Sequence, residues 1–291
     1  MKKMLIFGGT RFLGKKTALH FIDLGYEVTI ATRGKSCDDL GDKVKRLIID
    51  RTDSNHPGWE VVASENWDVI FDNIAYDWQS LALSLEKVKN VGHYLFTSSM
   101  AVYEGDKGAI GFKENDFDPT TYDYDSQQTD VSYGEGKRQG EAYLTKHAPF
   151  PVTFLRFPIV LDTDDYTERL KFYIEHALNH QTIIFKRQAG WYGFVHASEI
   201  PLAIEHVLEQ HITGPINIAS TESYHFEKFL EILANTTEQS LEYEIDSQQA
   251  PSPFSHYDTI LNVDRLMASG FKPSIQDSWL PDTMRYYVKN R

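Results

Sequence analysis

The chain has 291 residues, 41% of them hydrophobic, which is enough for one large α/β domain or for two domains around a shared cleft. Its formal net charge of −13 disfavours a nucleic-acid partner, because binding to an extended polyanion depends on Lys and Arg. The single cysteine, Cys37, excludes an internal disulfide, and neither a signal peptide nor a membrane span is evident, so we expect a cytoplasmic protein without membrane contact.

A strand, a tight turn and a helix are predicted at the start of the chain. Met4–Phe7 is typical of a buried parallel strand, and Lys15–Leu24 is amphipathic. Gly8 allows a sharp reversal, Gly14 allows close packing of the helix on its strand, and the helix N-terminus then faces an anion. Arg11 replaces the usual middle glycine, so its side chain must point away from a pyrophosphate or bind it. A turn without a ligand is the alternative.

The second predicted strand, Val28–Ala31, indicates the cofactor. In a dinucleotide fold the end of this strand meets the adenine ribose, where an acidic residue binds the 2′-hydroxyl and an Arg accommodates a 2′-phosphate. Here Thr32 and Arg33 follow, with Lys35 close behind. The sequence therefore favours NADP over NAD, with a solvated basic loop as the alternative.

Three further strands are predicted at Val44–Ile49, Asp68–Asn73 and His93–Thr97, with a helix that ends near Asn90 before the last of them. Strands that alternate with helices at this spacing predict an α/β fold with a Rossmann-type, doubly wound parallel sheet. The carboxylates of Asp50–Asp53 then lie on the ligand side of the sheet, within reach of an adenine.

The fifth strand leads to Ser99 at the same edge of the sheet. The next predicted helix, from Val131 to about Lys146, places Tyr133 and Lys137 four residues apart on one face. Two other Tyr/Lys pairs have this spacing: Tyr103/Lys107 and Tyr224/Lys228. Only Tyr133 lies in the helix after the Ser99 strand, so position rather than spacing selects it.

These three residues predict acid–base chemistry. The ammonium of Lys137 and an oxidised nicotinamide ring would favour the phenolate of Tyr133. Tyr133 would exchange a proton with a substrate hydroxyl while hydride passes to or from the nicotinamide. Ser99 would orient the same oxygen, and Lys137 would hold the nicotinamide ribose.

Together these motifs resemble the extended short-chain dehydrogenase/reductase superfamily, in its NAD-dependent epimerase/dehydratase branch. The likeness covers nearly the whole chain and is carried by Gly8-x-x-Arg11-x-x-Gly14, Asp50-Arg51-x-Asp53, Ser98-Ser99-x-x-Val102-Tyr103, Tyr133-x-x-x-Lys137, Arg156-Phe157-Pro158, Phe194-Val195-His196, Gly214-Pro215-Ile216-Asn217 and Asn262 to Pro273. The resemblance implies that Ser99, Tyr133 and Lys137 are catalytic, and it favours a homodimer through helices near 78–90 and 131–147.

Two departures from the family pattern matter. The sequence Gly-Gly-Thr-Arg-Phe-Leu-Gly is similar to an atypical subgroup that includes the chloroplast stem-loop RNA-binding proteins, so a cofactor-binding RNA-binding or regulatory protein without turnover is the alternative function. Sugar dehydratases carry an Asp-Glu pair where this chain has Met100 and Ala101. Elimination is therefore disfavoured, which leaves reduction or epimerisation of a small polar substrate, with a nucleotide sugar as one candidate.

The expected domains and site residues follow from these assignments. Residues 1–160, with roughly 191–220, are expected to form the dinucleotide-binding domain, and residues 161–190 and 221–291 a smaller C-terminal substrate-binding lobe. The expected cofactor-binding residues are Gly8, Thr10, Arg11, Phe12, Leu13, Gly14, Thr32, Arg33, Asp50, Arg51, Asn73, Lys137 and Phe157. The expected substrate-binding residues are Ser99, Tyr133 and Arg169, although Arg169 could instead pair with nearby aspartates. His176 and His180 lack a third ligand, so no metal site is expected.

Overall fold

The computed structural model describes residues 1–128, 130–188, 190–249, 252–254 and 258–290. The chain divides into two compact units. The first comprises Met1–Tyr103, Glu114–Arg156 and Ile200–Ile216, and the second, smaller unit comprises Glu104–Lys113, Phe157–Glu199 and Asn217–Arg291. Four stretches expected in the dinucleotide-binding domain lie in the second unit: residues 104–113, 157–160, 191–199 and 217–220. Within that unit β7 (Ile159–Leu161) pairs with β10 (Phe194–His196). The roles assigned to the two parts stay predictions.

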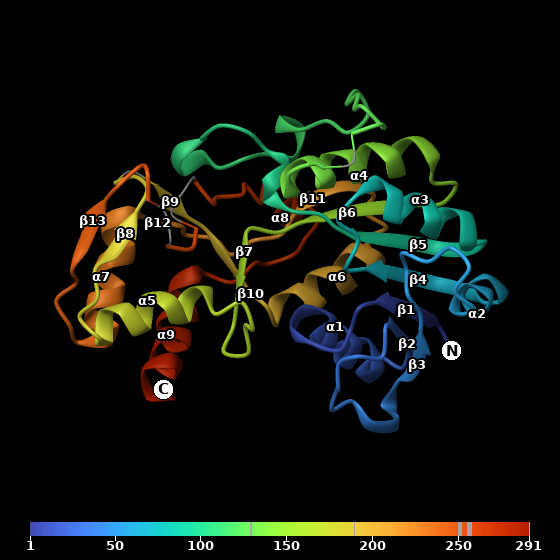
Figure 1. Ribbon diagram of the computed structural model, residues 1–291, viewed down its shortest axis with the longest axis horizontal. Coiled ribbons are helices and arrows are strands. Elements are labelled where there is room, and N and C mark those ends of the chain that lie inside the picture. Colours follow the sequence, from blue (N-terminus) through green and yellow to red (C-terminus); the bar gives the residue numbers. More distant parts are fainter. Residues whose placement is uncertain (129, 189, 250–251, 255–257, 291) are drawn as a thin grey trace. The chain divides into compact units, whose positions relative to one another are not determined.

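A seven-stranded sheet forms the centre of the first unit (Figure 1). Its strands are β1 (Lys3–Phe7), β2 (Glu27–Thr32), β3 (Lys45–Ile48), β4 (Asn66–Asp72), β5 (Asn90–Thr97), β6 (Val152–Arg156) and β11 (Gly214–Asn217). The order is β11-β6-β5-β4-β1-β2-β3, and every pairing from β3 to β6 is parallel. The strand order reverses at β1, which confirms the predicted Rossmann-type, doubly wound sheet and puts the expected ligand position outside the carboxyl end of β1.

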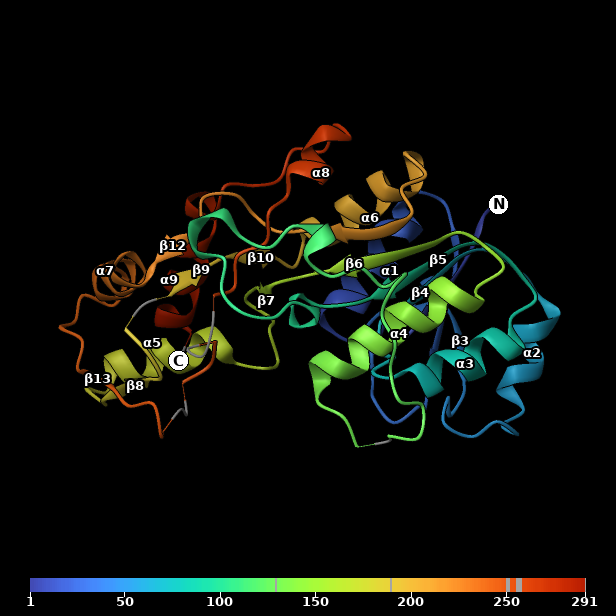
Figure 2. The same cartoon turned by 90° about the horizontal axis from the view of Figure 1, so that it is seen from above.

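Helices cover both faces of this sheet. They are α1 (Phe12–Asp23), α2 (Gly58–Ser64), α3 (Trp78–Lys87), α4 (Tyr133–His147) and α6 (Glu199–Glu209). Figure 2, like Figure 1, shows α3 and α4 together on one face and α1 and α6 on the other. β1 is buried from Met4 to Phe7, as expected of a strand covered on both sides.

The second unit is built from short strand pairs and helices. Besides β7 and β10 it contains β8 (Ile183–Phe185), β9 (Trp191–Tyr192), β12 (Tyr224–His225), β13 (Tyr243–Ile245), α5 (Arg169–Leu178), α7 (Phe226–Thr237), α8 (Asp264–Ala268) and α9 (Leu280–Lys289). Its core is aromatic: Phe194 and Phe229 pack around Phe254 with ring centroids 5.2 and 5.8 Å away. Among the described residues, no helix is long and apolar enough to cross a membrane.

Candidate functional site

A cavity of about 480 Å³ lies in the first unit at the carboxyl ends of β1, β2 and β3. It is lined by Phe7, Gly8, Thr10, Ala31, Thr32, Arg33, Lys35, Ser36, Ile49, Asp50, Arg51, Thr52, Ile74 and Tyr76. Six of the residues expected to bind the cofactor are among them: Gly8, Thr10, Thr32, Arg33, Asp50 and Arg51. The cavity lies where the strand order reverses, which is the usual ligand position in an open α/β sheet.

The turn between β1 and α1 is shaped by glycines. Gly8 and Gly9 have φ of 98° and 110°, a region that side chains rarely adopt. A Cβ on Gly14 would lie 2.7 Å from the backbone nitrogen of Gly9, so only glycine lets α1 approach the turn this closely. Arg11 is exposed and extended just before α1, and its side chain makes no capping hydrogen bond to the helix. This exposure is compatible with both alternatives predicted from the sequence, which are that Arg11 points away from a pyrophosphate or that it binds one.

Basic and acidic groups meet at the rim of the cavity. Arg33 and Lys35 are exposed there, beyond the end of β2. Hydrogen bonds from Thr52, and then the charge of Arg33, lower the pKa of Asp50. The carboxylate of Asp50 is therefore ionised and bonded to Thr52, and Arg33 and Lys35 are the candidate anion-binding groups of this rim.

Helix α4 carries the candidate catalytic lysine into the interior. Nζ of Lys137 donates hydrogen bonds of 2.6 Å to the carbonyl oxygens of both Ala75 and Thr97, and the residue is 1% exposed. Burial lowers its pKa from 10.5 to about 7. The same Nζ lies 5.5 Å from the ring centroid of Tyr133 and 5.0 Å from that of Tyr76. Tyr133 and Tyr76 are both about half exposed. The buried amino group of Lys137 therefore lies next to two tyrosines that solvent can reach.

Glycines bring α4 this close to its neighbours. A Cβ on Gly134 would lie 2.3 Å from the carbonyl oxygen of Ala101, and one on Gly136 would lie 2.3 Å from that of Tyr76. The start of α4, which carries Tyr133, is therefore adjacent to the 99–101 turn. Ser99 begins the short helix η2 (Met100–Val102) in that turn, and its Oγ accepts a hydrogen bond of 3.1 Å from the Ala101 nitrogen.

The other two Tyr/Lys pairs have different environments. The hydroxyl of Tyr103 accepts a 2.8 Å hydrogen bond from Arg156, and burial raises its pKa. The hydroxyl of Tyr224 donates to Asp277, and burial again raises the pKa. Phenols held in the neutral form are poor bases, so Tyr103 and Tyr224 are poor candidates for the acid–base role.

Several predicted site residues lie elsewhere or are already engaged. Phe157 and Arg169 belong to the second unit, where Arg169 begins α5. Arg51 lines the cavity, but both its Nη atoms bond to Asp72. Asn73 accepts a 3.1 Å hydrogen bond from the Thr97 hydroxyl. Among the described residues, no three His, Cys, Asp or Glu side chains gather as metal ligands.

Sequence reasoning did not single out Asp72 and Tyr76. The sequence points to them only indirectly. The helix after the Ser99 strand contains Gly134, Gly136 and Gly140, and glycines inside a helix indicate that another backbone packs closely against it. The backbone that α4 contacts is that of the turn after β4, which carries Tyr76.

Comparison with known proteins connects this architecture to a fold family. No protein-family model matches the chain. The chloroplast stem-loop binding protein of 41 kDa b from Arabidopsis thaliana is 30% identical over 115 residues, which is 35% of this chain and 30% of that protein. The UDP-glucose 4-epimerase of Bifidobacterium longum, solved with NAD+ and UDP, superposes with a TM-score of 0.75 at 14% identity and covers 100% of this chain and 99% of its own. That of Thermotoga maritima, solved with UDP-glucose, gives 0.74 at 17% identity over 99% of this chain and 97% of its own.

The chain has the fold of these epimerases. At 14% and 17% identity these structures show the fold alone, and they confirm the Rossmann-type α/β fold that the resemblance implied. The predicted likeness to the chloroplast stem-loop binding proteins is confirmed as a sequence match over about a third of the chain.

Proposed function

We propose that this chain is an NAD(P)-dependent oxidoreductase or epimerase that acts on a hydroxyl or carbonyl of a small polar substrate. The observation that carries the proposal is the buried Nζ of Lys137, 5.5 Å from the ring of Tyr133. Two of its structural neighbours, both epimerases, were solved with UDP or UDP-glucose, which supports a nucleotide sugar as the substrate class. Met100 and Ala101, in place of an Asp-Glu pair, favour epimerisation or reduction over elimination.

The residues at the cavity fit a dinucleotide. The absent Cβ of Gly14 lets the N-terminus of α1 pack against the turn at Gly9, and a pyrophosphate at that helix N-terminus would be stabilised by backbone N–H groups. Gly8 and Thr10 would hold that pyrophosphate, Thr32 the adenine ribose, and Arg33 a 2′-phosphate on that ribose. A bound nicotinamide cofactor supplies hydride transfer.

The remaining chemistry belongs to three side chains. Tyr133 exchanges a proton with the substrate oxygen, and its phenolate is favoured when Lys137 is charged. Because the pKa of Lys137 is about 7, both of its protonation states are accessible near neutral pH. Ser99 donates a hydrogen bond to the same substrate oxygen and orients it.

Substitution of Tyr133 by Phe tests this assignment. We expect turnover on UDP-sugars supplied with NAD(H) or NADP(H) to fall by about a hundredfold or more, because the proton-transferring hydroxyl is lost, while nucleotide binding is retained. Tyr286→Phe, at an exposed position on α9, is the matched control. Equal turnover of Tyr133→Phe and wild type would overturn the role of Tyr133.

We further propose NADP as the preferred cofactor, on the strength of Arg33 and Lys35 at the cavity rim. In calorimetric titrations NADPH should bind more tightly than NADH, and Arg33→Ala should weaken only NADPH, by about tenfold or more. Arg285→Ala, on an exposed part of α9, controls for loss of a surface charge. If both nucleotides lose affinity equally in Arg33→Ala, the 2′-phosphate contact is wrong.

A second candidate function rests on the 30% identity with a stem-loop binding protein. In that case the chain would bind cofactor and RNA without turnover. The net charge of −13 disfavours this alternative. A gel shift with stem-loop RNA at low salt would support it only if binding is tight and weakens steeply as salt is added.

A further inference from the structure

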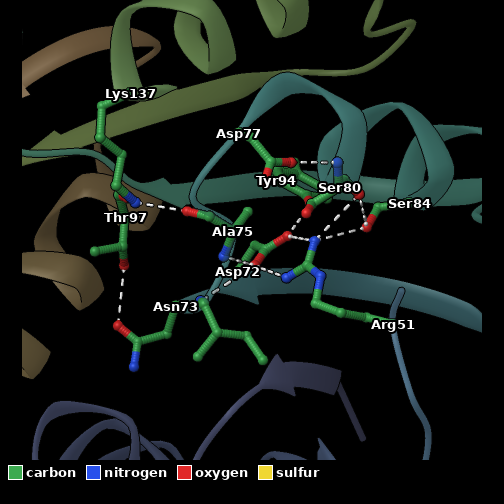
Figure 3. A network of polar contacts seen from close by, with 11 residues as sticks. Arg51, Asp72, Asn73, Ala75, Asp77, Ser80, Ser84, Tyr94, Thr97 and Lys137 are labelled. Carbon is green, nitrogen blue, oxygen red and sulfur yellow. Dashed lines mark hydrogen bonds and ion pairs between the residues drawn. The ribbon is translucent and has the colours of Figure 1, made fainter. Parts of the chain in front are cut away.

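Arg51, which lines the cavity, forms a buried ion pair with Asp72 (Figure 3). Nη1 of Arg51 lies 2.6 Å from Oδ1 of Asp72, and Nη2 lies 2.9 Å from Oδ2. The two side chains are 8% and 0% exposed. Nη2 also donates to the carbonyl oxygen of Ser80 and to the hydroxyl of Ser84. Burying two charges costs several kcal/mol per ion, and apolar replacements are often as stable, so stability alone is a weak reason for this pair.

The carboxylate of Asp72 also holds the turn that follows β4. Its Oδ1 accepts hydrogen bonds from the backbone nitrogens of Ile74, at 3.3 Å, and Ala75, at 3.1 Å. Its Oδ2 accepts a 2.6 Å hydrogen bond from the hydroxyl of Tyr94. Burial by itself raises the pKa of Asp72, but the charge and hydrogen bonds of Arg51 outweigh it, so the carboxylate is ionised. An ionised carboxylate is the stronger acceptor for the two turn N–H groups.

This turn supplies one of the two acceptors of Lys137. The nitrogen of Ala75 bonds to Asp72, and the carbonyl oxygen of the same residue accepts the 2.6 Å hydrogen bond from Nζ of Lys137. At the other end of the turn, Asp77 accepts from the nitrogen of Ser80 at the start of α3. Figure 3 shows the continuous path from Arg51 through Asp72 and Ala75 to Lys137.

The second acceptor is tied to the same turn. The carbonyl oxygen of Thr97 accepts from Lys137, and the hydroxyl of Thr97 donates to Asn73, the neighbour of Asp72. A shift of the 73–77 turn therefore changes the hydrogen bonding of the ammonium. Because Nζ is buried, a lost acceptor disfavours its charged form.

We propose that Arg51 and Asp72 are positioning residues for Lys137: the ion pair fixes Asp72, and Asp72 holds the Ala75 carbonyl against Nζ. The importance of this positioning for catalysis rests on the proposed function. The effect of Asp72 on the hydrogen bonding of Lys137 does not. Arg51 also lines the cavity that is proposed to bind the nucleotide. The chain of hydrogen bonds from Arg51 through Asp72 and Ala75 therefore connects that cavity to Lys137.

Two double variants separate the effect of the hydrogen bonds that hold the 73–77 turn from the effect of the buried charges. Arg51→Met/Asp72→Asn and Arg51→Met/Asp72→Leu both remove the ion pair, but only Asn keeps an oxygen that can accept from the Ile74 and Ala75 nitrogens. The fixed charges around Lys137 are then the same in both variants, because Asp77 and Glu141, which raise its pKa, are untouched and Arg51 and Asp72 are absent from both.

The readout is the titration of Lys137, followed by NMR of protein with ¹³C-labelled lysine and assigned with Lys137→Arg. We expect the midpoint in the Leu variant to lie about 0.5 pH unit or more below that in the Asn variant. Equal midpoints in the two folded variants would overturn the proposal. This measurement needs no substrate, so its failure is distinct from failure of the proposed function.

Turnover gives a second readout. The kcat of the Leu variant should be about tenfold or more below that of the Asn variant, at equal nucleotide affinity. If the Leu variant does not fold, Arg51→Met/Asp72→Ala takes its place in both comparisons, because alanine likewise lacks an oxygen that accepts from the turn. Equal Lys137 midpoints and equal kcat in the Ala and Asn variants would then contradict the proposal.

Discussion

Lys137 carries its ammonium among two carbonyl oxygens and the rings of Tyr76, Phe96 and Tyr133. Such a site solvates a charge only partly, which is why burial lowers the pKa of this lysine to about 7. Its charge therefore responds to small changes nearby, including the arrival of an anionic or cationic ligand. The charge of this candidate catalytic lysine is thus sensitive to its surroundings rather than fixed.

Replacement of Lys137 by Met should change how stability depends on pH. Between the folded pKa of about 7 and the unfolded value of 10.5, the unfolded chain binds more protons, so stability rises with pH. The free energy of unfolding of wild type should rise by about 1.4 kcal/mol per pH unit more steeply than that of Lys137→Met over this range. Urea unfolding between about pH 7.5 and 9 measures both slopes. Parallel curves would show that Lys137 is not perturbed by burial.

The candidate catalytic residues could be predicted because each has a distinct place in the chain: a serine after a strand, then a Tyr/Lys pair on the next helix. The proposed positioning role of Arg51 could not be predicted from the sequence. From the sequence it was a basic residue at a strand end, where cofactor binding is the natural interpretation. Its partner Asp72 is 21 residues away, and only the parallel pairing of β1 with β2 and β4 brings the ends of β3 and β4 together.

At the level of elements, helix α4 depends on its glycines. A Cβ at Gly136 would collide with the carbonyl oxygen of Tyr76 at 2.3 Å, so Gly136→Ala must displace either α4 or the turn after β4. We expect a destabilisation of about 1–3 kcal/mol, although alanine is the better helix former, together with a loss of turnover. Denaturant unfolding and activity measurements check this.

Lys146→Ala is the control, since Lys146 is exposed in the last turn of the same helix. It should leave both stability and activity near wild type. If Gly136→Ala is instead as stable as wild type, α4 does not need the close approach to Tyr76.

Helices and strands with long, regular patterns were predicted to within a few residues. β1, β2 and α4 are examples, and α4 begins at Tyr133 because Ser132 caps it by accepting from the Glu135 nitrogen. The helix α2 was missed, since its 7 residues are too few to show a periodic pattern.

At the scale of the whole molecule, the alternation of strands and helices predicted the doubly wound sheet, and the sheet order confirms it. The second unit was less predictable, because its pairs consist of two- or three-residue strands brought together by tertiary packing. β8 and β13, for example, pair across about sixty residues of sequence. The predicted homodimer and cytoplasmic location stay predictions, and light scattering of the purified protein would measure its mass.

The glycines of α4 also bear on the order in which the protein folds. A glycine in a helix interior costs about 1 kcal/mol relative to alanine, so Gly136 and Gly140 make α4 a poor helix on its own, by about 2 kcal/mol. It should become helical only on docking against β5 and the turn after β4. The nucleotide cavity at β1, β2 and β3 would then form before Tyr133 and Lys137 reach their places. On the proposed function, a chain arrested at that stage would bind a dinucleotide without turning over a substrate.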